Sequence, residues 1–372
     1  MADDRSGFEI PIVDESICIH CGLCEKVCPV LNDYGNKTSS APLRIYAARN
    51  KNEVTVKESS SGGIFSIFAE NVLKRNGVVY GVTLTTSLTA EHIRIESLDS
   101  LYKIRGSKYL HSTSANVFAK VRSDLNSGRE VLFSGSPCQI AAVHQFLRKS
   151  YPNLLCMEVV CHGVPSNLVF QKYVEYLEKR YRSHIINVNF RDKRKGWLTN
   201  YISFYFENGK IATQKSAENL FTLGYVENLF LRECCSDCKF KAMKSNSDIT
   251  LGDMWGIESL IPSYEVKNGV SMVCVNSQAG ESAFAEIKHL LDDSTEVRFT
   301  DIVKYNRCII DSAPPHKQRN YFLQQLTLVP VKKLLSEVLG VNRMKVVSNR
   351  IKSVKLRVIC HLVVIKHKLI KQ

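Results

Sequence analysis

Hydrophobic and polar positions along residues 43–181 follow two alternating periods, which predicts strands and helices in succession. Short runs rich in β-branched and aromatic residues predict strands, and longer segments with apolar residues every three or four positions predict helices. The expected strands are residues 43–49, 78–84, 91–97, 130–135 and 153–161, and the expected helices are residues 62–77, 114–128, 137–150 and 165–181. This alternation predicts an α/β fold with a sheet core.

After residue 181 the pattern changes to one that is typical of antiparallel strands. A hairpin is expected to turn at Asn208 and Gly209, a residue pair that favours tight β-turns. The expected elements are strands at 185–192, 200–214, 247–256 and 269–277, and a helix at 278–291. Together the two halves predict an α/β (α+β) architecture of mixed sheets flanked by helices.

The length and the cysteine content narrow the class of protein. A chain of 372 residues with 44% hydrophobic content can bury a large core in two or three packed units. Thirteen cysteines without a signal peptide indicate a reducing compartment, where cysteines serve metal or redox chemistry rather than disulfides. The longest charge-free apolar run near the C-terminus, 358–365, is far shorter than the roughly 20 residues of a membrane span. We therefore expect a cytoplasmic protein without a transmembrane helix.

The net charge of +14 is concentrated in a C-terminal tail. Residues 331–372 carry eight Lys and three Arg against one Glu. Apolar residues recur at three- and four-residue steps from Ile351 to Leu369, which predicts a helix with a basic flank. Such a helix can make a peripheral contact with an anionic membrane surface, or it can dock on its own protein. Nucleic-acid binding ranks below both, because the tail has no aromatic residues to stack on bases.

Four cysteines near the N-terminus form an iron-sulfur pattern. Cys18, Cys21, Cys24 and Cys28, followed by Pro29, match C-x2-C-x2-C-x3-C-P, the run that ligates a 4Fe-4S cluster in bacterial ferredoxins. A structural zinc site has no use for a third cysteine at this spacing or for the proline. The segment is therefore expected to be of iron-sulfur origin.

This run corresponds to half of a two-cluster ferredoxin, where the fourth cysteine of each run serves the cluster of the other. The residues before Cys18 contain no cysteine, so the cluster lacks its usual fourth ligand. Three outcomes are open: Cys28 becomes the fourth ligand, a three-iron or labile cluster forms, or the site is vestigial. We favour the first.

Four cysteines farther along the chain could form a second 4Fe-4S site. Cys138 follows a buried strand and a turn at a helix start, where free N–H groups stabilise a thiolate. Cys161 ends the next strand, and strand ends on one edge of a sheet meet in space. Cys235 and Cys238 form a C-x-x-C pair, with Cys234 as an odd neighbour. The alternatives are a structural zinc site and separate core cysteines.

Other candidate residues give weaker signals. His162, next to Cys161, is expected to be a satisfied or helix-capping histidine. The segment 59–63 lies at a helix start that favours phosphate, although a simple helix cap is the commoner use. The basic cluster 191–197 is either a solvated turn, which is the commoner case, or a clamp for an anionic cofactor or substrate. The cysteines assigned to the apolar core are Cys156, Cys274, Cys308 and Cys360.

Seven sequence blocks occur in a defined order: SSSGGIF, IRGSKYL, GSPCQIAA, CHGVPS, FRDKRKGW, CSDCKFK and SDITLGDMWG. From about residue 42 to 310 the chain thereby resembles the coenzyme F420 hydrogenase/dehydrogenase beta-subunit family. It is similar to bacterial members with a fused ferredoxin segment, which are associated with surface-polysaccharide biosynthesis. The resemblance implies a flavoprotein that binds FAD and 4Fe-4S clusters.

The resemblance also implies site residues and a division of the chain. The implied cluster ligands in the body are Cys138, Cys161, Cys235 and Cys238. The implied flavin contacts are Ser61, Gly62, Gly63, Arg105, Gly106, Ser107, Lys108 and Tyr109. The expected segments are a partial 4Fe-4S ferredoxin at 1–38, an N-terminal flavin-binding domain at 42–127, a C-terminal iron-sulfur and flavin domain at 128–310, and a basic helical tail at 311–372.

We therefore expect an oxidoreductase in which a cluster feeds single electrons to FAD, and FAD passes a pair to an organic substrate or a deazaflavin-type coenzyme. Its expected partner is a ferredoxin-like or other redox protein. One alternative is a non-catalytic electron-transfer subunit that serves a partner enzyme. Another is a zinc-stabilised scaffold protein.

Overall fold

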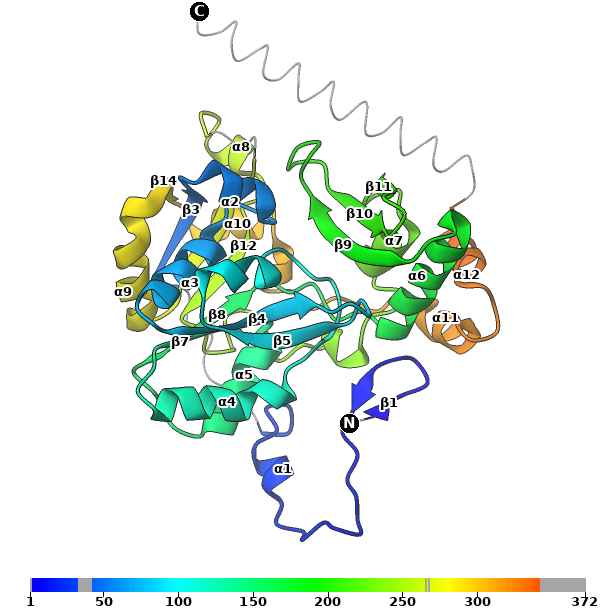
Figure 1. The fold of residues 1–372 in the computed structure, drawn as a ribbon, viewed down its shortest axis with the longest axis horizontal. Helices are drawn as coiled ribbons and strands as arrows, with labels where there is room; N and C mark the ends of the chain where they lie inside the picture. Colours follow the sequence, from blue (N-terminus) through cyan, green and yellow to red (C-terminus); the bar gives the residue numbers. More distant parts are fainter. Residues whose placement is uncertain (1, 33–41, 265, 267, 342–372) are drawn as a thin grey trace, which may run out of the picture.

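The computed structural model describes residues 2–32, 42–264, 266 and 268–341. Within these residues the chain forms a nine-stranded mixed sheet, a three-stranded sheet and a two-stranded hairpin (Figure 1). The helix expected between Ile351 and Leu369 lies outside the described residues. Of the helices inside them, none is both long enough and apolar enough to cross a bilayer.

The nine-stranded sheet is the centre of the larger part of the molecule. In spatial order its strands are β14 (Leu291–Glu296), β3 (Arg44–Asn50), β13 (Ser271–Val275), β12 (Ile249–Asp253), β8 (Leu154–Val159), β7 (Val131–Gly135), β4 (Val78–Leu84), β5 (Ala90–Ile95) and β6 (Ser112–Thr113). Strands β12, β8, β7 and β4 run parallel, and antiparallel strands flank them on both sides. The predicted class, mixed sheets flanked by helices, is confirmed.

Helices cover both faces of this sheet, because successive side chains of a strand point to opposite sides. On one face, Val79 of β4 packs with α3 (Ile64–Lys74) and α9 (Gln278–Ile287). On the other face, Val78 and Tyr80 pack with α4 (Ala115–Asn126) and α5 (Pro137–Leu147). Because helices cover both faces of the sheet, a ligand would have to bind at an edge of it. In α/β sheets, ligands bind at the carboxyl ends of the parallel strands.

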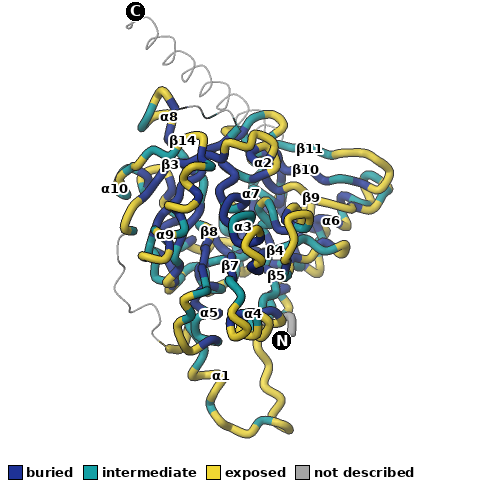
Figure 2. Tube along the Cα trace, turned by 60° about the vertical axis from the view of Figure 1, so that its left-hand side comes forward, coloured by how far each residue is buried: buried dark blue, intermediate teal, exposed yellow. Residues whose placement is uncertain are grey.

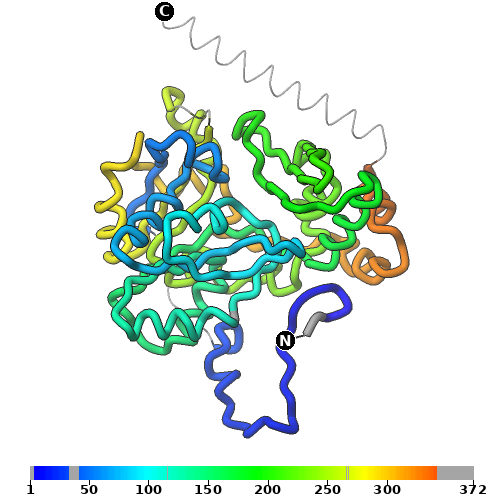
Figure 3. Tube along the Cα trace, in the orientation of Figure 1, coloured from blue at the N-terminus to red at the C-terminus, as the bar shows by residue number. Residues whose placement is uncertain are grey.

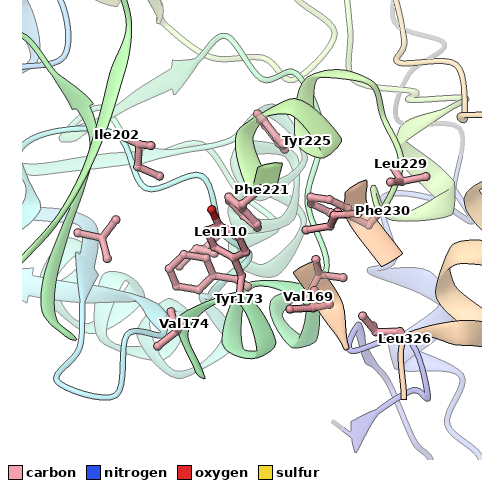
Figure 4. Packing of buried hydrophobic residues seen from close by; sticks show 14 of the residues in the cluster. Leu110, Val169, Tyr173, Val174, Ile202, Phe221, Tyr225, Leu229, Phe230 and Leu326 are labelled. Atoms are coloured by element: carbon pink, nitrogen blue, oxygen red, sulfur yellow. The ribbon is translucent and has the colours of Figure 1, made fainter. Parts of the chain in front are cut away.

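A second core lies beside the three-stranded sheet. Its elements are β9 (Ile185–Asp192), β10 (Tyr201–Phe206), β11 (Ile211–Lys215), α6 (Asn167–Tyr181), α7 (Leu220–Val226), α11 (Arg319–Gln325) and α12 (Val331–Val338). Aromatic and aliphatic side chains from α6, α7 and the segment after it interdigitate, among them Tyr173, Phe221 and Phe230 (Figure 4). Rings of Phe221 and Phe230 stack with centroids 5.4 Å apart.

The N-terminal segment extends from the body as a largely exposed loop (Figures 2 and 3). It contains β1 (Ala2–Asp3), β2 (Glu9–Ile10) and one helical turn, α1 (Leu23–Lys26). The hairpin is anchored where the Ser166 hydroxyl donates to the Ser6 carbonyl and the Arg232 guanidinium donates to the Glu9 carbonyl at 2.8 Å. These anchors hold the start of the segment and leave the cysteine loop at the surface.

Most predicted elements are present, and the differences have local causes. The helix expected at 278–291 ends at Ile287, and Leu291 begins β14, a polar strand that forms by pairing with β3. The elements not predicted are β1, β2, α1, β6, β14, α2 (Glu53–Glu58), α7, α8 (Ile257–Leu260), α10 (Phe299–Val303) and the 3-10 turns Leu98–Ile104, Glu233–Cys235, Lys288–Leu290 and Arg307–Ile309. Helices α11 and α12 lie within the tail at 311–372 that was expected to be helical. Strands from residues 42–127 and 128–310 share the large sheet.

Candidate iron-sulfur and cofactor site

Two of the predicted cluster ligands follow the carboxyl ends of neighbouring parallel strands. Cys138 is the second residue of α5, directly after β7, and Ser136 caps this helix with Gln139 in a capping box. Cys161 follows β8, which pairs with β7 in parallel. The Cys138 sulfur lies 3.2 Å from the Ser136 hydroxyl, so the helix start presents a polar environment to this thiol.

The other two predicted ligands come from a loop after α7. Cys235 ends a 3-10 turn, and its sulfur accepts a hydrogen bond from the Val164 N–H at 3.3 Å. Cys238 donates its backbone N–H to the Ser312 hydroxyl at 2.9 Å, and its side chain packs with Cys138 around Phe240. Segments separated by about a hundred residues therefore bring their cysteines to one region.

Burial and the neighbouring thiols shift the pKa values of these cysteines. The pKa of the Cys161 thiol is raised to about 12, chiefly by burial and then by the neighbouring Cys138 and Cys238 thiols. Burial likewise raises the pKa of Cys138, and Cys238 adds to this effect. Cys234 accepts a hydrogen bond from Cys235, which lowers the pKa of Cys234 to about 6 and raises that of Cys235. Coordination of a metal cluster would remove this mutual repulsion of thiolates.

The body cysteines form no tight metal-ligating group in the described residues. There, Glu15, Cys18 and His20 are the group whose ligand atoms all lie within 4.8 Å of one another. A single zinc ion with Zn–S bonds of about 2.3 Å requires a tight group of ligands. Four cysteine thiolates are the donor set of a 4Fe-4S cluster, so the chemistry of the four body cysteines fits this cofactor.

Two residues at this site differ from what the sequence predicts. Cys308, expected in the apolar core, is only half-buried, and its sulfur lies 3.5 Å from Nδ1 of His162. Lys241 is buried and donates to the carbonyls of Cys161 and Cys308. Neither residue has a local sequence signal, because only tertiary folding brings residues 241 and 308 to the end of β8. Cys156 and Cys274 are buried as expected, and Cys360 lies outside the described residues.

The two segments expected to contact the flavin lie side by side. The Ser107 N–H and hydroxyl both donate to the Ser60 hydroxyl, at 2.7 and 2.8 Å. Arg105 donates to the Ser66 hydroxyl at 3.0 Å and pairs with Glu58. The structure therefore joins the helix start at 59–66 to the loop at 105–109.

Gly62 and Gly63 have structural reasons to be glycine. A Cβ atom on Gly62 would lie 2.6 Å from the Ala48 carbonyl oxygen, so no larger residue fits between β3 and β13 there. Gly62 also donates its N–H to the Ser271 hydroxyl at 2.9 Å. Gly63 has a φ of 79°, in the left-handed region that favours glycine.

Two partly buried lysines, Lys108 and Lys193, adjoin these segments. Lys193 donates to the Ser61 and Asn268 carbonyls, each at 2.7 Å, and Lys108 donates to the Arg105 carbonyl at 2.8 Å. Burial lowers the pKa of each lysine to about 7. Within the described residues neither ammonium group forms an ion pair with a carboxylate. Lys193 also donates to the Val56 carbonyl at 2.5 Å, so its three N–H donors are all used and it would act on an anionic group through its charge.

A path of aromatic contacts connects the cofactor loop with the cysteine site. The ring of Tyr109 stacks on Tyr225 with centroids 5.3 Å apart, and Tyr225 contacts the His162 ring edge-on at 5.1 Å. Tyr225 also donates to the Gly163 carbonyl at 3.2 Å. His162 in turn contacts Cys308, and burial lowers the pKa of this histidine. The two predicted sites are therefore neighbours.

The N-terminal cysteines lie near the body cluster site in the fold. Cys21 and Cys24 are exposed, whereas Cys18 and Cys28 are half-buried. The Lys239 ammonium, next to Cys238, donates to the Val30 carbonyl at 2.9 Å. This contact places the end of the N-terminal cysteine segment against the loop that carries Cys235 and Cys238.

Sequence profiles of known families match most of the chain. The profile for the C-terminal part of the coenzyme F420 hydrogenase/dehydrogenase beta chain matches residues 128–295. The corresponding N-terminal profile matches residues 45–119, and a 4Fe-4S binding domain profile matches residues 11–31.

Two individual proteins are similar to this chain. One subunit of the F420H2 dehydrogenase of Methanosarcina mazei is 24% identical over 191 residues, which cover 49% of this chain and 52% of that protein. The chain thus spans about half the length of this curated relative. A chain in a solved structure of the F420-reducing NiFe hydrogenase complex from Methanosarcina barkeri has 14% identity and a TM-score of 0.47, covering 82% of this chain and 92% of that one.

Proposed function

Because the chain belongs to the coenzyme F420 hydrogenase/dehydrogenase beta-subunit family, we propose that it is an iron-sulfur flavoprotein oxidoreductase. It would move electrons between 4Fe-4S clusters and FAD and on to an organic substrate or a deazaflavin-type coenzyme. The observation that carries this proposal is the convergence of Cys138, Cys161, Cys235 and Cys238 beside the paired cofactor segments.

Each group of residues has a role in this proposal. Cys138, Cys161, Cys235 and Cys238 would hold the body cluster through their thiolates. The segment 59–63 and the loop 105–109 would hold FAD, with Lys108 and Lys193 opposite its pyrophosphate. When bound, these cofactors supply the conversion between one-electron and two-electron transfer. The stacked Tyr109 and Tyr225 rings would lie between the two cofactors.

The N-terminal segment would hold a second cluster, with Cys18, Cys21, Cys24 and Cys28 as its ligands. The contact between Lys239 and Val30 supports this proposal, because it holds the segment close to the body ligand Cys238. The segment would then exchange electrons with a ferredoxin-like or other redox partner at the exposed surface.

Anaerobic purification tests the cofactor content. We expect a coloured protein with iron and acid-labile sulfide in equal amounts, at least one cluster per chain, and one FAD per chain. The measurement combines a visible spectrum with iron, sulfide, zinc and flavin analysis. Colourless protein with stoichiometric zinc and no sulfide would contradict the proposal and favour a zinc-stabilised scaffold.

A second candidate is a non-catalytic electron-transfer subunit that serves a partner enzyme. The curated relative is named as a subunit, and the surface around the N-terminal cysteines exposes apolar side chains such as Ile17 and Ile19, at 77% and 83%. Exposed apolar surface favours a protein partner. Reduced protein that transfers electrons to a soluble deazaflavin or organic acceptor on its own would exclude this candidate.

The pH dependence of flavin binding follows from the two lysines. With a pKa of about 7, Lys108 and Lys193 are cationic at pH 6 and largely neutral at pH 8. Asp253 and Glu53 raise the pKa of Lys193, and Arg191 and Arg49 lower it. We expect the Kd of FAD for the apoprotein to rise severalfold between pH 6 and pH 8, as measured by fluorescence titration.

Matched variants check this expectation. Lys193→Met should weaken FAD binding at pH 6 and reduce the pH dependence, because it removes one of the two titrating cations. Lys195→Met removes an exposed cation nearby. This variant should leave the affinity for FAD at pH 6 and its pH dependence unchanged. A Kd that is flat with pH in the wild type would contradict the role of the two lysines.

A further inference from the structure

Lys241 occupies an unusual position for a lysine. Only 8% of its surface is exposed. Its ammonium group donates to the Cys308 carbonyl at 2.7 Å and to the Cys161 carbonyl. The same loop carries Cys238 three residues earlier, so the buried cation lies among the proposed cluster ligands.

The described residues provide no carboxylate partner for this ammonium group. They place no Asp or Glu oxygen within ion-pair distance of Lys241. The buried carboxylate of Glu158 accepts instead from the hydroxyls of Ser245 and Thr250, the latter at 2.7 Å. Burying an ammonium ion without a counter-charge costs several kcal/mol. The Glu158 carboxylate interacts with Lys241 without forming an ion pair, and the ammonium group lowers the pKa of Glu158 against the effect of burial. A negatively charged group held beside the Cys161 carbonyl would add a counter-charge closer to this ammonium group.

The cysteine thiolates and the cluster that they would bind can supply this negative charge. The Lys241 ammonium donates to the carbonyl of the proposed ligand Cys161, and its loop carries the proposed ligand Cys238, so its positive charge lies beside the ligand set. A 4Fe-4S cluster with four thiolate ligands carries a net negative charge, and reduction adds one more electron. In a buried site, a fixed cation stabilises the more negative, reduced state more than the oxidised state.

We propose that Lys241 is the buried counter-ion of the cluster held by Cys138, Cys161, Cys235 and Cys238, and that it raises the reduction potential of this cluster. The inference rests on the proposed function, since it requires the cluster to be present. Lys241 does not ligate iron or touch the substrate in this scheme. Its positive charge acts on the reduction potential of the cluster.

The test is a redox titration of anaerobically purified holoprotein, with the cluster followed by electron paramagnetic resonance. Lys241→Met keeps the apolar stem and removes the charge, whereas Lys241→Arg keeps the charge. At a fixed potential we expect the ratio of reduced to oxidised cluster to fall at least tenfold in the Met variant, which is about 59 mV for a one-electron couple. The Lys241→Arg protein should keep a reduction potential near that of the wild type.

Lys304→Met is the matched control. The Lys304 side chain is 67% exposed and lies four residues before Cys308, so solvent screens its charge. This variant should keep the wild-type reduction potential. Equal shifts in the Lys304→Met and Lys241→Met proteins would overturn the inference, as would an unchanged potential in a Lys241→Met protein that retains its cluster.

A further variant separates charge from hydrogen bonding. Lys241→Gln retains N–H donors toward the two carbonyls and lacks the charge. A Gln variant that holds the cluster at the wild-type potential would overturn the counter-ion role. If the Met and Gln variants both fold by circular dichroism but lose iron that the Arg variant keeps, the charge itself is required, which supports the inference. Wild-type protein without iron and sulfide would instead overturn the proposed function, and the inference with it.

Discussion

Replacing Cys161 with alanine is expected to abolish the proposed body cluster and to lower the iron and sulfide content by one cluster per chain. Cys161 lies at the end of β8, where its thiol is electrostatically coupled to those of Cys138 and Cys238. Three thiolates and one empty position leave a cubane open to loss of iron. Iron and sulfide analysis, together with the loss of the cluster's visible absorbance, measures the effect.

Cys274→Ala is the control for this prediction. Cys274 is a buried cysteine in β13, within an apolar cluster that contains Met254 and Met272. Its removal creates a small cavity and should leave the iron content unchanged. A Cys161→Ala protein with wild-type iron and sulfide would remove Cys161 from the ligand set. If both variants lost iron equally, the loss would reflect unfolding rather than ligation.

The order of the strands in the sequence was enough to predict part of the cysteine site. Cys138 and Cys161 follow consecutive strand patterns in the sequence, and parallel neighbours bring their carboxyl ends together. The C-x-x-C pair at Cys235 and Cys238 was recognisable from its spacing alone. The ligand set itself remains a prediction, although the structure places all four residues in one region.

The groups around these cysteines were not predictable. Lys241 and Cys308 have ordinary local surroundings in the sequence, and only the packing of the loop after Cys238 against 307–309 brings them to Cys161. The hydrogen bond between Lys239 and Val30 likewise joins residues 209 positions apart. Contacts of this kind depend on tertiary folding, which periodicity does not encode.

The fold was predicted best where burial is strongest. Strands β4, β7 and β8 have apolar side chains toward both faces, so their sequences are continuous hydrophobic runs. In contrast, β14 has the sequence LDDSTE, and only Leu291 in it is buried. This edge strand forms because its backbone pairs with that of β3. The sequence of β14 does not indicate this pairing. The short helices α8 and α10 were missed because segments of four or five residues show no helical period.

Removing the carboxylate of Asp253 is expected to destabilise the protein by about 3–5 kcal/mol, because it leaves a buried guanidinium unpaired. Asp253, at the end of β12, accepts from both terminal nitrogens of Arg191, at 2.7 and 3.1 Å. The Arg191 side chain is only 7% exposed. Asp253 also accepts from the Trp197 indole N–H at 3.1 Å, and Trp197 stacks on Trp255 with centroids 4.8 Å apart.

The free energy of unfolding of Asp253→Ala, from urea denaturation followed by tryptophan fluorescence, measures this loss. The matched control is Asp311→Ala, which breaks a pair with Arg307 in which the side chains are 71% and 43% exposed. An exposed pair contributes at most about 1 kcal/mol, so this variant should unfold near the wild-type midpoint. Equal losses in the free energy of unfolding of the two variants would mean that an unpaired, buried Arg191 does not destabilise the protein. A loss confined to Asp253→Ala would show that the ion pair between Arg191 and Asp253 holds β9 and β12, and thus the two sheets, together beside the proposed flavin site.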